Sequence, residues 1–222
     1  MPTAFGPDAG NKLIFHVFQD ERFVDLNLYQ YGWERTEPLH SYGPHRRNHY
    51  LFHYIIAGQG RLYVGEHVYP VGPGEGFLIL PGQTTTYASD EADPWEYTWI
   101  EFDGLRVRES LSLAGLGAAK PIYTPATRAG GEKLRECMLQ IVQDGEASPI
   151  RQIGRGFLFL DQLCLLYTSY RASGARPRSH TCSGRALASG WVSTRFTSVS
   201  PCSSSTNCQA AYRSSSVGSV SR

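Results

Sequence analysis

Two histidines on one predicted strand, His49 and His53, have a residue type and spacing that could do chemistry. Closely spaced neutral imidazoles supply the nitrogen ligands of many transition-metal sites. Here the pair lies four residues apart on a predicted strand, which separates the two side chains by about 13 Å along the chain. They are too far apart to bind one ion together, so we expect no metal at this pair. His53 lies on a largely apolar strand and is either a hydrogen-bonded core residue or a residue that faces a bound ligand.

A second candidate is the aromatic strand Tyr97–Phe102, in which alternation places Tyr97, Trp99 and Glu101 on one face. A carboxylate beside two aromatic rings lies either at the rim of a sheet or inside a polar pocket. Tryptophan and tyrosine rings pack well against the C–H side of a pyranose, while hydroxyl and charged groups bind its oxygens. The strand therefore predicts either a sugar-binding wall or a part of the apolar core.

These residues need a scaffold, and the stretch around them predicts one made of strands. Short runs rich in aromatic and β-branched residues alternate with glycine, proline and acidic turn clusters, which is typical of a small antiparallel β-barrel. Glycines flank Gln59, and Gly65-Glu66 follows soon after, so we expect tight hairpins at both places. The run Pro70–Gly76 is expected to be a turn cluster. The predicted strands are His49–Ile56, Arg61–Val64, His67–Val71, Gly76–Leu80 and Tyr97–Phe102.

The strand that carries His53 is expected to be covered on both sides, because both of its faces are largely apolar. Before it, Leu13–Phe18 and Leu26–Trp33 predict either a leading strand pair or an arm over the barrel mouth. The polar segment Glu37–Arg47, which contains two prolines, is expected to be a loop. Alternation assigns Tyr50, Phe52, Tyr54 and Ile56 to one face of the central strand and Leu51, His53 and Ile55 to the other.

After the strands the hydrophobic period changes to that of helices. A short helix is predicted over Leu105–Leu113, and Gly131–Asp144 shows a clean apolar stripe. A further helix should begin after Ser148-Pro149, where serine can cap and proline suits the first turn. We expect these helices to pack on the barrel, on each other or on a second subunit. The stripe predicted for the last helix is Ile153, Phe157, Leu160, Cys164 and Tyr167.

Residues 169–222 differ in kind from the rest of the chain. They hold 16 serines and seven arginines but no lysine, and all 20 acidic residues precede them. Few large apolar residues are present, and none recurs at helix or strand spacing, so no core offsets the entropy of ordering. We interpret this segment either as the product of a coding frame shifted near Leu165–Tyr170 or as a genuine disordered tail.

The start of the chain lacks the apolar run of a signal peptide, and no stretch reaches the roughly 20 apolar residues of a membrane helix. Cys137 and Cys164 lie on predicted helices at positions that look buried, so a disulfide framework is not expected. Together these features predict a cytoplasmic protein without contact to a membrane.

Three blocks of sequence resemble a known family. In chain order they are Gly58–Gly60, Pro73–Gly82 and Asp93–Phe102, the last of which contains two tryptophans. Their order and separation resemble the effector-binding domain of AraC-type bacterial transcription regulators, over about residues 11–165. The resemblance implies a cupin-like antiparallel β-barrel that binds a small molecule such as a sugar, amphipathic dimerisation helices, and a C-terminal pair of helix-turn-helix motifs that binds DNA.

The resemblance divides the chain into an N-terminal arm (1–25), a cupin-like effector-binding barrel (26–104), a helical dimerisation segment (105–168) and the disordered tail (169–222). Nothing in the tail resembles helix-turn-helix sequence, so DNA contact is expected only through a domain not recognisable here. The resemblance places Tyr87, Tyr97 and Trp99 in the pocket. With His53 and the nearest basic residues, the full set of expected ligand-binding residues is Tyr87, Tyr97, Trp99, His53, Arg46 and Arg47.

These features leave two alternative functions, which belong to different classes. The first is a non-enzymatic sensing and dimerisation module that binds a small molecule, expected to be a carbohydrate, without a cofactor. The second is a freestanding cupin-fold enzyme that acts on a sugar. Cupin enzymes hold a metal with a further histidine after the Pro-Gly turn, whereas here Thr84, Thr85 and Thr86 occupy those positions, and hydroxyls are poor ligands for such metals. We favour the first function; stoichiometric iron, manganese or zinc in the purified protein would favour the second.

Overall fold

A computed structural model describes residues 12–18 and 23–172, all of which belong to one compact unit. Ten strands are described in it, followed or interrupted by three helices: α1 (Val107–Leu113), α2 (Arg128–Gln143) and α3 (Pro149–Ala172). The strands are β1 (Leu13–Val17), β2 (Asn27–Arg35), β3 (Ser41–Arg46), β4 (Tyr50–Ala57), β5 (Gly60–Val64), β6 (His67–Val71), β7 (Gly76–Ile79), β8 (Thr84–Ser89), β9 (Glu96–Asp103) and β10 (Ile122–Tyr123).

The strands form two antiparallel sheets whose inner faces share one apolar core. The larger sheet has the order β1-β2-β9-β4-β7-β10, and the smaller has the order β3-β8-β5-β6. Strand β4 is central because it pairs with β9 on one side and with β7 on the other. The fold class predicted from the sequence, a mainly β cupin-like barrel followed by helices, is confirmed.

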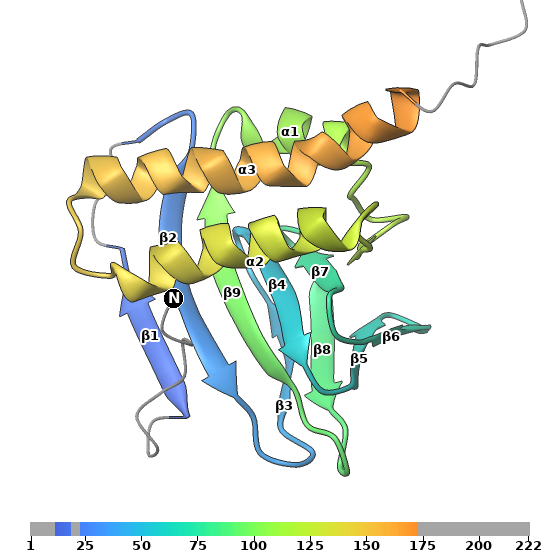
Figure 1. Cartoon of the computed structure of the whole chain (residues 1–222). Helices are drawn as coiled ribbons and strands as arrows, with labels where there is room; N and C mark the ends of the chain where they lie inside the picture. Colours follow the sequence, from blue (N-terminus) through green and yellow to red (C-terminus); the bar gives the residue numbers. More distant parts are fainter. Residues whose placement is uncertain (1–11, 19–22, 173–222) are drawn as a thin grey trace, which may run out of the picture. The chain divides into compact units, whose positions relative to one another are not determined.

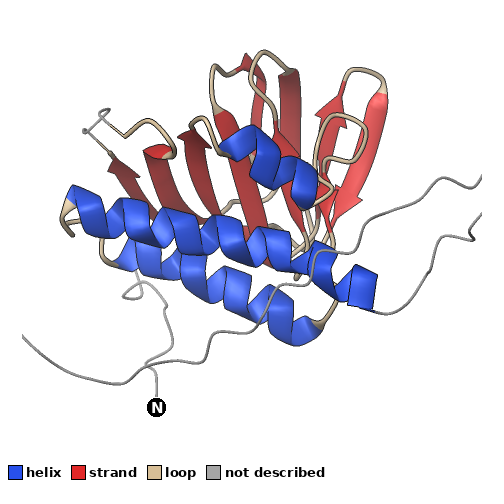
Figure 2. Ribbon diagram, turned by 90° about the horizontal axis from the view of Figure 1, so that it is seen from above, coloured by secondary structure: helices blue, strands red, loops and turns tan. Residues whose placement is uncertain are grey.

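The helices form a layer over the outer face of the larger sheet, as Figures 1 and 2 show. Phe159 of α3 is fully buried, with its ring 5.7 Å from that of Phe52 and 5.3 Å from that of Phe102. Strand β4 is therefore buried on both sides, and the predicted division of its residues between two apolar faces is confirmed. Its outer residues Tyr50, Phe52 and Tyr54 join the helix layer, whereas Leu51 and Ile55 join the core between the sheets.

Three strands were missed in the sequence: β3, β8 and β10. The segment predicted as a loop, Glu37–Arg47, contains β3, which pairs with β8 at one edge of the smaller sheet. Every residue of β3 is exposed, so no apolar alternation marks it. Edge strands of this kind tolerate proline because one side of the backbone needs no hydrogen-bond partner.

The predicted hairpin at Gly58–Gly60 is also wrong. The flanking strands β4 and β5 belong to different sheets, so these residues carry the chain from one sheet to the other. Gly58 has a φ of 80°, and an added Cβ atom would collide with the backbone of Pro94. The hairpin predicted at Gly65-Glu66 is correct, because β5 and β6 pair directly across it.

The buried stripe of α3 differs from the predicted one. Ile153 and Leu160 are buried as expected, but Phe157 is 42% exposed and Cys164 is half-buried. The helix is rotated so that its next row of residues faces the sheet. The buried residues on this face are Gln152, Ile153, Gly156, Phe159, Leu160 and Leu163.

Helix α3 continues to Ala172, so residues 169–172, which the sequence assigned to the tail, are helical. The rest of the predicted tail, residues 173–222, and residues 1–11 and 19–22 of the predicted arm lie outside the described residues. Among the described helices, none is both long and apolar enough to cross a membrane.

Removing a side chain from the helix–sheet layer should destabilise the protein. Leu163 is fully buried there, so Leu163→Ala leaves a cavity and should lower the free energy of unfolding by about 2–5 kcal/mol. Leu105→Ala is the matched control, because Leu105 is 73% exposed, and should change it by less than about 0.5 kcal/mol. Urea denaturation measures both, and equal losses would contradict the assigned packing.

Candidate functional site

The inner face of the larger sheet presents a row of polar and aromatic side chains across β2, β9 and β4. Trp99 lies in the middle, with Gly32 of β2 opposite it on one side and His53 of β4 on the other. Glu101 follows two residues further along β9, on the same face, because strand residues alternate. The sequence-based grouping of Tyr97, Trp99 and Glu101 on one face is thus reproduced by the pairing of β9 with both of its neighbours.

Arg47 joins this row to the smaller sheet. Its guanidinium Nη1 donates to Oε2 of Glu101 at 3.2 Å, and its side chain is only 13% exposed while that of Glu101 is 6% exposed. The guanidinium carbon also lies 5.1 Å from the ring centroid of Tyr42 on β3. One residue therefore holds a carboxylate of one sheet and an aromatic ring of the other.

Glu101 has two further partners. Oε1 of Glu101 lies 3.3 Å from Nδ1 of His49, and Oε2 accepts a hydrogen bond from Nε2 of Gln30. The His49 ring stacks on Tyr29, with ring centroids 3.5 Å apart and planes inclined by 8°. A buried carboxylate needs such partners because an unpaired charge is costly away from water. The result is a polar network at one end of the inner face.

Behind this network, Tyr87 of β8 and Tyr97 of β9 are packed into the core between the sheets. They are 5% and 2% exposed, and their ring centroids lie 6.5 Å apart. Tyr97 donates its phenolic O–H to Oε2 of Glu34 at 2.7 Å. Burial, reinforced for Tyr97 by Tyr87 and Glu34, raises the pKa of both phenols. Both hydroxyls are therefore protonated near neutral pH, and that of Tyr97 already donates its proton to Glu34.

His53 lies at the centre of the same aromatic group and is 1% exposed. Its ring stacks on Phe77 at 4.5 Å and lies 4.8 Å from Tyr87 and 5.0 Å from Tyr97. Burial, and secondarily the charge of Arg47, lowers the pKa of His53 well below 6.5. Its Nδ1 atom is buried without a hydrogen-bond partner. His53 is thus a neutral core imidazole with one unused polar atom.

Trp99 differs from the two tyrosines because its ring is only half-buried. On the side of β1 it stacks against Phe15, with ring centroids 6.3 Å apart. Gly32 makes room for the ring, since an added Cβ atom there would collide with Trp99 and with the carbonyl oxygen of Ile14. The inner-face residues of β1 are about half exposed: Leu13, Phe15 and Val17 are 52%, 50% and 58% exposed. This end of the inner face is therefore open and amphipathic.

A family model described as the AraC-like ligand binding domain matches residues 27–160, which run from β2 into α3. The chain belongs to this family. The matched span holds both the barrel and the helix layer, so the AraC-like domain here is one unit of sheets and helices.

Curated relatives of this AraC-like domain are operon regulators. The Msm operon regulatory protein of Streptococcus mutans serotype c is 32% identical over 130 residues, which is 59% of this chain and 45% of the relative. The raffinose operon transcriptional regulatory protein RafR of Pediococcus pentosaceus is 35% identical over 91 residues, which is 40% of this chain and 33% of the relative. The chain spans less than half the length of these relatives.

Among solved structures, a Cupin 2 conserved barrel domain protein from Salinispora arenicola matches 44% of this chain and 81% of its own chain, with 16% identity and a TM-score of 0.34. That likeness is too slight to bear on function. The family is assigned from the match to the family model, and the fold is given by the strand order.

The AraC-like domain brings together most of the residues expected to bind a ligand. Tyr87, Tyr97 and His53 form the packed inner layer, while Trp99 and Arg47 lie at the open end. Arg46 does not join them: it is exposed, and its guanidinium lies beside the turn at Gly82. The two arginines point to opposite sides because they are neighbours at the end of a strand.

The expected set of ligand-binding residues did not include Glu34, Tyr42, His49 or Glu101. Alternation had already placed Glu101 on the same face as Tyr97 and Trp99, so the sequence carried the signal for it. Glu34 and Tyr42 could not have been found, since their place depends on the pairing of β2 with β9 and of β3 with β8. Within the described ranges, no group of three histidine, cysteine, aspartate or glutamate residues is placed to hold a metal ion.

The neutral state of His53 makes the stability of the AraC-like domain depend on pH. Because its pKa is lowered in the folded state, the unfolded chain binds the extra proton as the pH falls below about 6.5. The wild type should therefore lose up to about 2 kcal/mol of unfolding free energy through this residue between pH 7 and pH 5.

The variant His53→Gln removes that contribution, so its loss over the same pH range should be smaller by about this amount. His45→Gln is the control, because His45 is exposed, and it should keep the wild-type dependence. Urea denaturation at pH 7, 6 and 5 measures the three proteins. A His53→Gln variant with the wild-type dependence would show that His53 is not buried as a neutral ring.

Proposed function

We propose that this chain is the effector-sensing and dimerisation module of an AraC-type transcription regulator, and that its effector is a mono- or disaccharide. The observation that carries the proposal is the half-buried ring of Trp99, which shares one open sheet face with the Arg47–Glu101 ion pair. The names of the curated relatives, which regulate Msm, raffinose and lactose operons, support a sugar as effector.

The chemistry of the open end suits a carbohydrate. The face of Trp99 can pack against the C–H groups of a pyranose, and sugar hydroxyls can both donate and accept hydrogen bonds. Glu101 and Glu34 offer carboxylate oxygens, while Arg47 and Gln30 offer N–H donors. Most of these groups already bond to one another, so they are held in place before a ligand arrives, which lowers the cost of ordering them.

We infer that the module holds its effector without transforming it. His53 is enclosed by aromatic rings, with Phe77 stacked on one face at 4.5 Å, and no serine, cysteine or threonine is hydrogen-bonded to it among the described contacts. A nucleophile needs a general base within hydrogen-bond reach. The same inference places the protein in the cytoplasm, where the operator DNA of such a regulator lies, with DNA contact made by a separate C-terminal domain.

The exposed face of α3 supports a homodimer. Ile150, Phe157 and Leu158 are 76%, 42% and 56% exposed and recur at helical spacing on the side away from the sheet. Gly154 lies between them, and an added Cβ atom there would meet nothing within 4 Å. An apolar stripe of this kind with a small residue in its middle fits a second helix of the same chain.

A sugar effector should stabilise the folded chain. In a thermal-shift screen of mono-, di- and trisaccharides, at least one sugar should raise Tm, since a ligand at about 100 times its Kd adds about 2.7 kcal/mol. Trp99→Ala should weaken the binding of that sugar by about 2 kcal/mol, as the loss of other buried aromatic contacts does. Trp99→Phe, which keeps a ring, should retain most of the binding. A complete panel without any shift would overturn the sugar proposal.

The dimer should depend on the α3 stripe. The double variant Phe157→Glu and Leu158→Glu places like charges in the proposed interface, and should convert the dimer to a monomer at micromolar concentration. Leu105→Glu is the control, because Leu105 is exposed outside α3, and it should stay dimeric. Light scattering coupled to size-exclusion chromatography measures the masses, and a wild-type monomer would count against the interface.

A further inference from the structure

A cavity of about 540 Å³ lies outside the barrel, between α1 and the outer side of β4 and β7. We call it the α1 cavity. Its volume falls within the range of small-molecule sites, roughly 300–1,000 Å³. The residues that line it are Tyr50, Leu78, Leu80, Arg108, Leu111, Ser112, Gly115, Leu116, Gly117, Ala118, Ala119 and Lys120.

The floor of the α1 cavity is apolar and fixed. Tyr50 and Leu78 come from the outer face of β4 and β7 and are 9% and 0% exposed, while Leu111 and Leu116 are 3% and 7% exposed. These side chains belong to the helix–sheet layer, so they are held by packing on their other sides. The floor can therefore accept an apolar body without rearrangement of the core.

The outer wall is a short loop that is hydrogen-bonded at both ends. After α1, the N–H of Leu116 donates to the carbonyl of Leu111 at 2.9 Å, and Gly117 and Lys120 exchange two hydrogen bonds of 3.1 Å. Beyond the loop, the N–H of Leu78 donates to the carbonyl of Pro121 at 2.8 Å. The wall is thus tied both to the helix and to strand β7.

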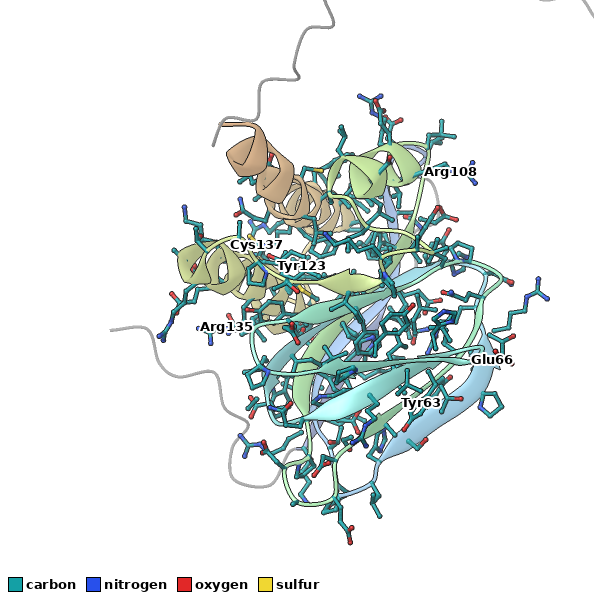
Figure 3. All side chains as sticks on the ribbon, turned by 90° about the vertical axis from the view of Figure 1, so that its right-hand side faces the viewer. Tyr63, Glu66, Arg108, Tyr123, Arg135 and Cys137 are labelled. Carbon is teal, nitrogen blue, oxygen red and sulfur yellow. The ribbon has the colours of Figure 1, made fainter. Side chains whose placement is uncertain are left out.

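The charged residues that line the α1 cavity are both cations. Arg108 and Lys120 are exposed, and no carboxylate lines the cavity with them. The neighbouring acid, Glu109, forms an ion pair with Arg106 at 3.2 Å. Within the described part of the chain, neither Arg108 nor Lys120 has an ion-pair partner. Figure 3 shows Arg108 reaching outward from α1.

We propose that the α1 cavity binds a small organic anion with an apolar body, either a carboxylate or a phosphate ester. The apolar body would lie on Tyr50, Leu78 and Leu111, and the anionic group would lie between Arg108 and Lys120. Arginine and lysine favour both kinds of anion through charge-assisted hydrogen bonds. This site goes beyond the proposed sugar site and does not depend on it.

The sheet separates the two sites. Tyr50 and Leu78 face the α1 cavity, whereas their chain neighbours Leu51 and Ile79 face the core between the sheets, and Leu51 pairs with Glu101. A bound anion and a bound sugar would therefore contact opposite faces of the same strands. The two sites can be tested independently with variants of one site or the other.

Isothermal titration calorimetry of the full chain tests the proposal with three probes: octanoate, 1-naphthyl phosphate and the neutral octanol. At least one anion should bind at one site per chain, and octanol should bind about tenfold more weakly than octanoate because it lacks the charge. Preference for octanoate or for the naphthyl ester distinguishes a carboxylate ligand from a phosphate ligand.

Two variants locate the binding. Arg108→Gln with Lys120→Gln should weaken the bound anion at least tenfold, and Ala118→Trp should abolish binding by filling the cavity. The control pair Arg61→Gln with Lys133→Gln removes the same charge elsewhere and should leave binding within about twofold. Trp99→Ala should also leave it unchanged. Absence of binding by both anions, equal binding of octanol, or full binding by the Arg108/Lys120 variant would overturn the proposal.

Discussion

The ion pair between Arg47 and Glu101 joins the larger sheet to the end of β3 in the smaller sheet. A largely buried pair of this kind adds little to stability, because the loss of hydration offsets most of the attraction. Removing one partner of such a pair lowers stability by about 3–5 kcal/mol in comparable cases. The pair therefore fixes the position of the two sheets relative to each other at their open end. Gln30, His49 and Tyr42 are arranged around it. The same groups that the proposed sugar would contact thus hold the two sheets together at this end of the inner face.

The remaining layers follow from strands that are buried on both faces. On β4, Phe52 faces the helices while His53, one residue later, faces the aromatic core. Helix α3 closes the outer layer with Phe159 and leaves Phe157 exposed two residues away. A ligand that moves the inner face therefore acts on strands that are in direct contact with the helices. That contact gives the AraC-like domain a physical route from the barrel to α3, the helix that carries the exposed apolar stripe.

Polarity is distributed unevenly along the inner face. At one end the core holds neutral groups, since burial keeps His53 uncharged and the Tyr97 phenol protonated. At the other end ionised groups are neutralised in pairs, and the ring of Trp99 is reachable. A ligand with both apolar C–H faces and hydroxyl groups fits this change in polarity along the inner face better than a purely apolar ligand or a free ion does.

The sequence alone determined the features that depend on local periodicity. The two faces of β4, the grouping of Tyr97 with Trp99 and Glu101, the hairpin at Gly65 and the apolar stripe of α2 all follow from the repeat of side-chain directions along one element. Only the tertiary structure decided which strands pair and which side of an element is covered. It made β3 an edge strand, placed Arg47 inside and Arg46 outside, brought Glu34 to Tyr97, and set the rotation of α3. These outcomes depend on contacts between residues far apart in the chain. The periodic pattern of one element does not show which other element it will pack against.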